Sequence, residues 1–308
     1  MNKEFSYSFI IPHKNCPDLL QRCVDSIPER EDVQIIVIDD NSDADKKPSI
    51  NRKGVEVVLL DAEHSKGAGR ARNVGLGHAK GKWLLFADAD DYYTDFLPIL
   101  LDKYIDDNTT DIVYLNACMF DENDDIRPFN THLINNYLNN VKGAEMRLRY
   151  GMWTPWSRMV KKSIVDTNSI CFDELPAGND IIFGLKCSRY AKVIRVESEI
   201  IYKYFKPRKG SCTDKARDKM IDTRLALICN VIKFNREVGY NSRTNLFEII
   251  IKHLKQKDVS FWVGIKLYTK YLNLCEVSMI SDICKFIVKK GRFCFRDVFG
   301  IMCTSKRV

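Results

Sequence analysis

Short apolar runs that alternate with helical patterns are the feature that most constrains the fold of this chain. Runs rich in β-branched, aromatic and other apolar residues predict strands at 7–11, 34–38, 55–60, 82–87 and 111–115. Amphipathic stretches between them predict helices at 18–27, 69–79 and 96–105. Continuous apolar strands separated by helices are typical of a parallel sheet that is covered on both faces. We therefore predict an α/β fold with a mostly parallel sheet flanked by helices.

Three of these strands are followed by polar residues. Pro12-His13-Lys14-Asn15 follows the first strand, Asp39-Asp40-Asn41-Ser42 the second, and Asp88-Ala89-Asp90-Asp91 the fourth. Ligands of such sheets bind beyond the carboxyl ends of the strands. Three polar ends at one edge of a sheet indicate a binding site.

Asp88 and Asp90 stand two residues apart, and in an extended chain such side chains point to the same side. Neighbouring carboxylates repel one another unless a cation lies between them. Mg²⁺ and Mn²⁺ prefer oxygen ligands, and Mg²⁺ typically takes one or two carboxylates together with substrate phosphates. The pair therefore fits a metal–diphosphate site, although a solvated turn is an alternative because Asp is common where strands end.

A glycine-rich segment with two arginines, Arg70 and Arg72, lies between the third and fourth strands. It predicts a turn that enters a helix and offers cations to an anion. The dinucleotide-binding pattern Gly-x-Gly-x-x-Gly and the Walker phosphate loop are both absent. A nucleotide contact and a structural ion pair are both open for Arg72, and the nearby Asp pair favours the nucleotide contact.

Charge divides the chain unevenly. Residues 1–205 carry 26 Lys/Arg and 32 Asp/Glu, a net −6, whereas residues 206–308 carry 22 and 9, a net +13. The basic part is helical by pattern from residue 214 and indicates an acidic partner. Eleven irregularly spaced cysteines are typical of reduced thiols, and no leader peptide or membrane-spanning run is recognised. We expect a cytoplasmic protein.

Several segments, in this order, resemble the inverting family 2 glycosyltransferases with the GT-A fold. They are FIIPHKNCPDLLQRCVDSI, IIVIDDNSD, GAGRARNVGL and WLLFADADDYY, extended by MWTPWSRMVKKSIVDTNSICFDE, LPAGNDIIFGLKC and YKYFKPRKGSCT. The resemblance covers residues 5–213. It implies a GT-A (Rossmann-like) domain over residues 1–213, and residues 214–308 then form a basic helical extension.

The resemblance also implies roles for individual residues. Those implied to bind the nucleotide are Pro12, Asn15, Asp39, Asp40, Arg72 and Asp88. One of the pair Asp39 and Asp40 is implied to contact the base, usually uracil. Asp90, with Asp88, is implied to hold Mg²⁺ or Mn²⁺, and Asp180 matches the catalytic base.

Three further residues are candidate acceptor contacts. Asn179 stands where the family usually has Glu, directly before Asp180. Trp153 and Trp156 are candidates for an aromatic floor under an acceptor sugar, although large aromatic side chains mostly serve packing. Residues 206–212 are a candidate clamp for the donor diphosphate.

The implied reaction is the transfer of a sugar from a UDP-linked donor to a glycan or lipid-linked glycan, with inversion, in cell-surface polysaccharide synthesis. A haloacid-dehalogenase-like phosphatase with Asp88 as its nucleophile is an alternative, against which Tyr92 stands where Thr or Val is expected. A non-catalytic nucleotide-sugar-binding protein is another, motivated by Asn179. The basic region is a candidate contact for the anionic inner face of the cell membrane. Nucleic acid is not expected, because no recognised module accompanies the charge.

Overall fold

The computed structural model describes residues 4–121, 125–175, 177–205, 221–242, 244–255 and 260–290. The chain divides into two compact units, Met1–Arg208 and Lys209–Val308. The predicted boundary between residues 213 and 214 lies outside the described residues, so it stays a prediction.

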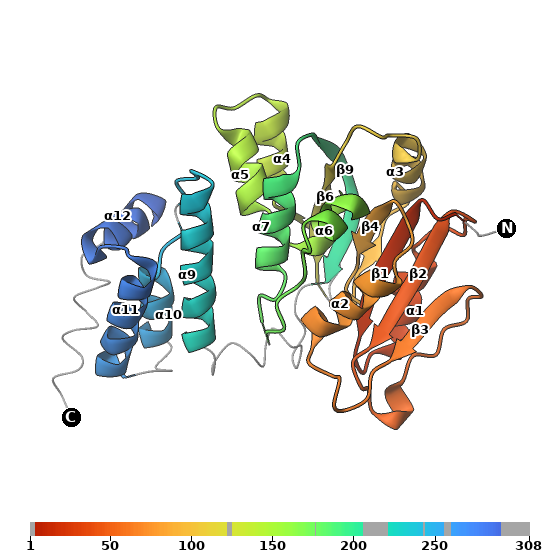
Figure 1. The fold of residues 1–308 in the computed structure, drawn as a ribbon, viewed down its shortest axis with the longest axis horizontal. Coiled ribbons are helices and arrows are strands. Elements are labelled where there is room, and N and C mark those ends of the chain that lie inside the picture. Colours follow the sequence, from red (N-terminus) through yellow and green to blue (C-terminus); the bar gives the residue numbers. More distant parts are fainter. Residues whose placement is uncertain are drawn as a thin grey trace. The chain divides into compact units, whose positions relative to one another are not determined.

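A single mixed sheet forms the centre of the N-terminal unit (Figure 1). Its strand order is β3-β2-β1-β4-β8-β6-β9-β5, and β7 pairs with β6. The strands are β1 (Tyr7–His13), β2 (Val33–Asp39), β3 (Val55–Leu59), β4 (Trp83–Phe86), β5 (Tyr92–Tyr93), β6 (Ile112–Phe120), β7 (Arg127–Phe129), β8 (Arg158–Lys161) and β9 (Ile194–Phe205). The predicted α/β fold is confirmed.

Parallel and antiparallel pairs both contribute to this sheet. β1–β2, β2–β3, β1–β4 and β6–β9 are parallel pairs. β8 runs antiparallel to both of its neighbours, β4 and β6. β5 pairs antiparallel with β9, and β7 pairs antiparallel with β6. The sequence did not predict β8, because its four residues, RMVK, are too short and too mixed to show a strand pattern.

Helices cover the sheet on both faces, as the continuous apolar strands require. The helices are α1 (Pro17–Asp25), α2 (Ala68–His78), α3 (Leu97–Tyr104), α4 (Thr131–Leu138), α5 (Ala144–Gly151), α6 (Lys162–Thr167) and α7 (Ile181–Tyr190). α1 and α3 share one buried cluster with Phe9 and Ile11 of β1. α2 and α4 to α7 share the other cluster with Ile10, whose side chain points to the opposite face.

The carboxyl ends of β1, β2 and β4 meet at one edge of the sheet. The β1–β2 register pairs His13 with Asp39, and the β1–β4 register pairs Ile10 with Phe86. From β1 the chain proceeds to β2 and β3 on one side, then returns to β4 on the other. The strand order therefore reverses between β1 and β4, which is where ligands bind in open α/β sheets.

The C-terminal unit is helical in its described residues, as predicted. It contains α9 (Ile221–Glu237), α10 (Phe247–Lys255), α11 (Phe261–Cys275) and α12 (Met279–Lys290). Leu225, Leu246, Ile250 and Leu272 belong to its apolar core. None of the described helices combines the length and the low charge needed to cross a bilayer.

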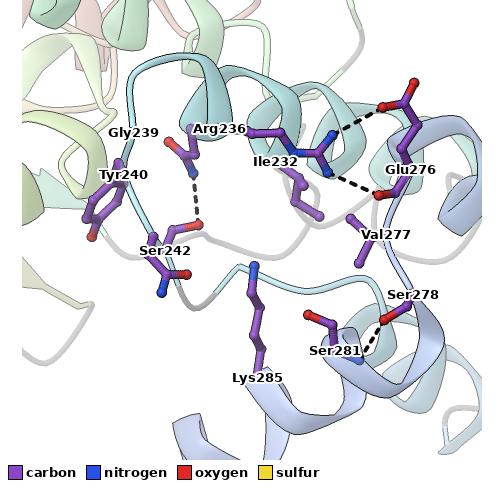
Figure 2. Close-up of a pocket in the computed structure, with 12 residues that line it drawn as sticks. Ile232, Arg236, Gly239, Tyr240, Ser242, Glu276, Val277, Ser278, Ser281 and Lys285 are labelled. Atoms are coloured by element: carbon purple, nitrogen blue, oxygen red, sulfur yellow. Dashed lines mark hydrogen bonds and ion pairs between the residues drawn. The ribbon is translucent and has the colours of Figure 1, made fainter.

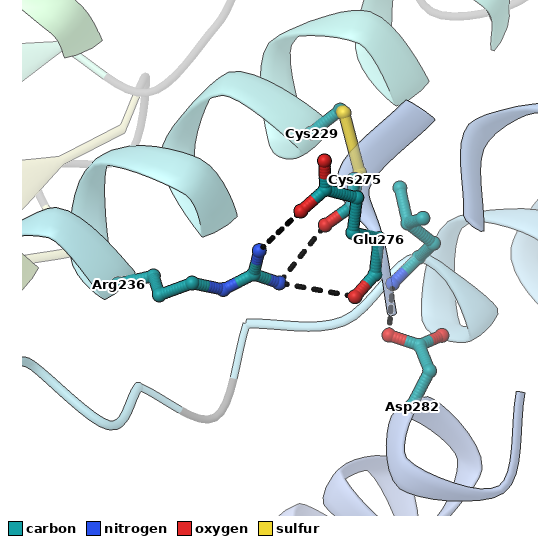
Figure 3. The surroundings of a disulfide bond; sticks show 6 residues. Cys229, Arg236, Cys275, Glu276 and Asp282 are labelled. Carbon is teal, nitrogen blue, oxygen red and sulfur yellow. Dashed lines mark hydrogen bonds and ion pairs between the residues drawn. A yellow bond between two sulfur atoms is a disulfide. The ribbon is translucent and has the colours of Figure 1, made fainter. Parts of the chain in front are cut away.

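A disulfide and a buried carboxylate link the helices of this unit. Cys229 and Cys275 form a disulfide between α9 and the end of α11, which differs from the expectation of reduced thiols (Figure 3). Asp282 of α12 is fully buried. Its carboxylate accepts hydrogen bonds from the N–H groups of Leu246 (3.0 Å) and Phe247 (2.8 Å) and from the Tyr268 hydroxyl (2.9 Å). Asp282 thereby joins the start of α10, α11 and α12.

Candidate active site

Asp39, at the end of β2, is buried and bonded within the protein. Its Oδ1 lies 2.8 Å from His13 Nδ1 and accepts from the Ser42 hydroxyl at 2.5 Å, and its Oδ2 accepts from the Ser42 N–H at 3.1 Å. His13 Nε2 accepts from the Cys16 N–H at 3.2 Å, so the ring proton lies on Nδ1 and is donated to Asp39. Asp39 therefore fixes the loops that follow β1 and β2.

Asn15 joins the same two loops from the β1 side. Its N–H donates to Ser42 Oγ at 2.8 Å. Its side-chain amide exchanges two bonds with Asp43, from Nδ2 to Oδ2 (3.1 Å) and from the Asp43 N–H to Oδ1 (2.8 Å). The backbone φ of Asn15 is +57°, a left-handed conformation that Asn tolerates better than most residues. Pro12 is buried within β1, opposite Ile38.

Asp40 connects the end of β2 to the start of α2. Its Oδ1 accepts from the Gly67 N–H at 3.2 Å, and its Oδ2 lies 3.4 Å from the ammonium of Lys14, an exposed side chain. Only one of its two oxygens is thus held by the backbone. This leaves Asp40 better able than Asp39 to exchange a partner for a ligand.

The carboxylates after β4 lie in a tight turn and not in an extended chain. The Asp91 N–H donates to the Asp88 carbonyl at 3.0 Å, which closes the turn. The prediction that Asp88 and Asp90 lie in an extended chain is therefore wrong, although both side chains are partly exposed. Arg22 of α1 stabilises the turn, because its Nη2 donates to the Asp90 carbonyl at 2.6 Å.

Asp91, the third carboxylate, is a structural residue that the sequence reasoning missed. It is fully buried and accepts from the Tyr202 hydroxyl (2.8 Å) and the Phe205 N–H (2.7 Å). Tyr202 Oη in turn accepts from the Asp88 N–H at 2.9 Å. Burial, and then the charges of Asp88 and Asp90, raise the pKa of Asp91. Asp91 therefore ties the turn to β9, through partners that are distant in the sequence.

Arg72 lies between the turn after β4 and the start of α7. Its Nη2 donates to Asp88 Oδ1 at 2.5 Å and its Nη1 to Asn179 Oδ1 at 2.9 Å. The guanidinium also covers the ring of Phe172, with its carbon 5.4 Å from the ring centroid. The sequence left an ion pair and a nucleotide contact open for Arg72. The structure has the ion pair with Asp88, one of the carboxylates proposed for the site.

Two small features of α2 bring Arg72 to this position. A Cβ atom at Gly69 would lie 2.1 Å from the Asp173 carbonyl oxygen, so only glycine allows this approach. Asn73 brackets the backbone of Phe172, donating from Nδ2 to its carbonyl (3.0 Å) and accepting from its N–H (2.8 Å). The Gly-Arg-Ala-Arg-Asn segment therefore docks against the loop that leads to α7.

Asp180 occupies the residue directly before α7 and is partly buried. Its side chain makes no capping hydrogen bond to the helix. Burial raises the pKa of the Asp180 carboxyl, while the positive charge of Arg72 opposes that rise. A carboxylate that does not cap the helix and has a raised pKa is suited to accept a proton.

The backbone around α7 is packed tightly. A Cβ at Gly184 would lie 2.6 Å from the Trp153 carbonyl oxygen. Arg158 is fully buried and donates from Nη1 to the Gly184 carbonyl at 2.8 Å and from Nη2 to the Met152 carbonyl. These contacts fix α7, and with it Asp180, relative to the segment that carries Trp153.

The three acceptor candidates differ in how accessible their side chains are. Trp156 is buried and stacked on Tyr202 and Tyr204, with centroids 4.8 and 5.3 Å away, so its ring has no free face for a sugar. Asn179 is also buried and its amide is used by Arg72. Trp153 is partly exposed and donates to the Tyr150 carbonyl at 2.6 Å, so it stays a candidate. Residues 206–212 lie outside the described residues.

The donor set fits a divalent cation that is shared with a substrate. Among the described residues, no group of three His, Cys, Asp or Glu side chains could hold a metal by itself. The turn offers the two partly exposed carboxylates of Asp88 and Asp90. One or two carboxylates, completed by phosphate oxygens and water, is the usual environment of Mg²⁺.

Comparison with known proteins decides the family. The model of "Glycosyl transferase family 2" matches residues 8–165, which is about half of the chain. The chain belongs to glycosyl transferase family 2. The matched range includes all but the first residue of β1, together with β2, α2 and the turn at residues 88–91. The phosphatase alternative is therefore wrong.

Curated relatives share this region. A poly(ribitol-phosphate) beta-glucosyltransferase of Bacillus spizizenii is 27% identical over 223 residues, 66% of this chain and 32% of that protein. WfaP of Escherichia coli, a UDP-Glc:alpha-D-GlcNAc-diphosphoundecaprenol beta-1,3-glucosyltransferase, is 36% identical over 89 residues, 28% of this chain and 36% of that protein. The chain thus spans about a third of the length of these relatives.

The solved structure of S. aureus TarS residues 1–349 in complex with UDP-GlcNAc has a similar fold. Its TM-score is 0.58 at 19% sequence identity, over 94% of this chain and 93% of that one. This likeness agrees with the predicted GT-A fold.

Proposed function

We propose that this family 2 glycosyltransferase moves a sugar, with inversion, from a UDP-linked donor to a hydroxyl of a glycan or lipid-linked glycan. The observation that carries the proposal is the position of Arg72. It bridges Asp88, in the turn after β4, and Asn179, next to Asp180. The donor diphosphate needs a positive charge and the acceptor hydroxyl needs a base. The contact supports Arg72 and Asp180 as these two groups at the switch point of the sheet.

Nucleotide recognition is assigned to the loops after β1 and β2. Asp40 is our candidate for the contact with the base, because Asp39 is already bonded to His13 and Ser42. Asn15 and Pro12 shape the loop after β1, and the side-chain amide of Asn15 is already bonded to Asp43. Uridine as the nucleoside is supported by WfaP, whose name specifies UDP-Glc, and by the TarS complex with UDP-GlcNAc.

Asp90, with Asp88, would hold Mg²⁺ or Mn²⁺ together with the donor diphosphate. The bound metal would supply positive charge that stabilises the departing diphosphate. Arg72 contributes a fixed positive charge beside Asp88. Arg22 keeps the turn in place by its bond to the Asp90 carbonyl.

Asp180 is proposed to take the proton of the acceptor hydroxyl. The hydroxyl oxygen forms the new bond to the anomeric carbon as the bond from that carbon to the diphosphate oxygen breaks. The proton goes to the Asp180 carboxylate, and UDP leaves with the bonding electrons. A single displacement of this kind inverts the anomeric centre.

The acceptor and the location are proposed from the relatives and from charge. The relatives' names specify poly(ribitol-phosphate) and a diphosphoundecaprenol-linked sugar, so an acceptor in cell-surface polysaccharide synthesis is proposed. The net +13 of residues 206–308 supports a place at the cytoplasmic face of an anionic membrane. On α11, Trp262 is 77% exposed and Val263 49% exposed, and both lie near Lys266 in the sequence. Such a mixture is typical of surfaces that contact lipid headgroups.

The test is donor hydrolysis by the purified full chain. With Mn²⁺ and a panel of nucleotide sugars, we expect slow release of UDP from one UDP-sugar. EDTA and Asp90→Ala should each abolish it while the circular dichroism spectrum stays unchanged. If no nucleotide is released from any donor but UDP binds, the protein is a non-catalytic binder. If UDP binding is unaffected by EDTA and by Asp90→Ala, the metal assignment is wrong.

A further inference from the structure

The C-terminal unit contains a cavity of about 410 Å³ that the proposed reaction does not use. It is formed by the end of α9, the turn that follows α9, and the segment from Glu276 to Lys285 (Figure 2). Its volume lies within the range of small-molecule sites. All of its lining residues belong to this one unit.

Polar side chains line most of this cavity, which is unusual between helices that share an apolar core. Ser278, Ser281 and Lys285 are three, four and seven residues apart and so lie on one face of α12 and the residue before it. Ser278 Oγ accepts from the Ser281 N–H at 3.2 Å, which starts the helix. Small hydroxyl side chains at these positions leave the space open for a ligand.

The two cations of the cavity differ in their partners. Arg236 is satisfied, because it lies 3.4 Å from the Glu276 carboxylate and donates to the carbonyls of Cys275 (2.9 Å) and Glu276 (3.3 Å). Lys285 is partly buried, and within the described part of the chain it has no ion pair or hydrogen bond. A partly buried lysine without an anion beside it favours binding of an anion.

Asn235 provides a second, independent observation that points to a ligand in this cavity. It is only 2% exposed, and its Nδ2 donates to the Ser242 hydroxyl at 2.9 Å. Its Oδ1 is buried and has no hydrogen-bond partner in the described structure. Exchanging the amide oxygen and nitrogen would still leave one of them unpaired. Buried polar atoms are almost always bonded, so Asn235 Oδ1 is suited to accept a hydrogen bond from a ligand hydroxyl.

We propose that this cavity binds a phosphorylated polyol. The phosphate would lie against Lys285, the Ser281 hydroxyl and the N-terminal end of α12, where helix amides favour an anion. The hydroxyl groups would lie toward Ser242 and Asn235 and would complete the bonding of the buried amide, directly or through water. The site would hold part of an acceptor chain away from the reacting sugar; this assignment of the ligand's source rests on the proposed function.

The experiment is a titration of the purified full chain, without donor, with three probes: ribitol 5-phosphate, ribitol and inorganic phosphate. Binding is followed by calorimetry. We expect ribitol 5-phosphate to bind at least tenfold more tightly than either fragment, because it uses both ends of the cavity. Equal binding of inorganic phosphate would show an adventitious anion site and overturn the proposal, as would no binding of ribitol 5-phosphate.

Lys285→Ala tests the phosphate end, and Lys266→Ala is its matched control, since Lys266 is an exposed lysine of α11 outside the cavity. We expect Lys285→Ala to weaken ribitol 5-phosphate binding about tenfold, as for loss of a charge-assisted bond, and Lys266→Ala to change nothing. Equal losses in both would mean diffuse attraction to a basic unit and would overturn the proposal.

Ser281→Leu tests the cavity without changing charge. Ser281 is exposed, so the substitution should leave the fold intact, which circular dichroism can check. The leucine should block both the phosphate and the polyol, and unchanged binding would refute the site. Donor hydrolysis with water as acceptor should stay at the wild-type rate in Lys285→Ala and Ser281→Leu. Failure here is therefore separable from failure of the proposed transferase.

Discussion

The two units place their polar groups in opposite ways. At the sheet edge of the N-terminal unit the polar side chains bond mainly to one another: Asp39 to His13 and Ser42, Asp91 to Tyr202, and Arg72 to Asp88. In the cavity of the C-terminal unit, Lys285 and one amide atom of Asn235 have no partner in the described structure. The first arrangement fits a preorganised site for the proposed chemistry, whereas the second fits the proposed binding of a ligand.

The net charge also differs between the two parts of the chain. The net −6 of residues 1–205 belongs to the part of the chain where a metal and a nucleotide diphosphate are proposed to bind. The net +13 of residues 206–308 has few acidic groups to balance it. If the two units have separate functions, substitutions in the first should affect the rate of sugar transfer. Substitutions in the second should affect the stability of that unit and its binding to an acceptor or a membrane surface.

The largest expected effect is on catalysis by Asp180. Asp180→Asn keeps the size of the side chain but removes the proton acceptor, so transfer should fall by about 10²–10⁴-fold. Affinity for UDP with Mn²⁺ should stay the same, because the proposed nucleotide contacts lie on other residues. The measurement is kcat together with a UDP binding isotherm.

Glu174→Gln is the matched control for that substitution. Glu174 lies in the same loop but pairs with Lys66 and Arg70 at 3.7 and 3.4 Å. It should retain near wild-type transfer. An Asp180→Asn variant that transfers sugar normally would exclude Asp180 as the base, and Asp173 would be tested next.

The second effect is on stability and is confined to the C-terminal unit. Asp282→Ala removes three hydrogen bonds to a fully buried carboxylate. At about 1 kcal/mol per bond, the unit should lose about 3 kcal/mol of unfolding free energy. Denaturant unfolding should show this loss, while donor hydrolysis stays unchanged.

Asp222→Ala is the control within the same unit. Asp222 is exposed and pairs with Lys270 at 3.3 Å, a contact that solvent screens strongly. It should not change the unfolding midpoint. A fall in donor hydrolysis in Asp282→Ala would show that the two units do not function separately.

The third effect is a pH dependence set by Asp180. The base must be deprotonated, so activity falls as pH falls through its pKa. Because burial raises that pKa in spite of Arg72, the acid limb of kcat should have its midpoint above the ordinary Asp value of about 3.9. Below the midpoint the rate should drop about tenfold per pH unit. A midpoint at or below the ordinary value would contradict the burial argument.

The sequence predicted the parts of the site that depend on local pattern. Apolar runs place the ends of β1, β2 and β4, and the parallel arrangement then brings their polar residues to one edge. It could not predict the internal use of Asp39 or the buried role of Asp91. A carboxylate that binds a ligand and one that bonds to a distant N–H, such as that of Phe205, have the same local sequence.

Long-range contacts explain the other differences. Arg72 meets Asn179 across 107 residues, and this pairing is why the predicted acceptor contact at Asn179 is used inside the protein. Trp156 stacks on two tyrosines of β9, which no local pattern reveals. The lining of the C-terminal cavity also depends on which helix faces meet. Its serines look like ordinary solvent-exposed residues in the sequence.

The fourth effect concerns the shape of Arg72 and not its charge. Arg72→Lys keeps the positive charge but cannot bond to Asp88 and Asn179 together, because an ammonium lacks the planar fork of the guanidinium. We expect kcat/KM for the donor to fall about tenfold. Arg70→Lys, whose parent side chain is partly exposed and lies 3.4 Å from Glu174, should change little. Equal effects of both substitutions would show that only the total charge near α2 matters.

The smallest effect tests the charge difference between the units directly. Lys266→Gln removes one exposed charge from α11, and Lys80→Gln removes one from the exposed surface of the N-terminal unit. A basic side chain near an anionic surface contributes about 1 kcal/mol, so Lys266→Gln should weaken co-sedimentation with phosphatidylglycerol vesicles about fivefold at low salt. Lys80→Gln should have no effect, and both variants should become indistinguishable from wild type as salt screens the attraction. Equal losses for the two lysines would mean that the membrane senses net charge alone. Binding that ignores lipid charge and salt would leave the basic helices as solvated surfaces.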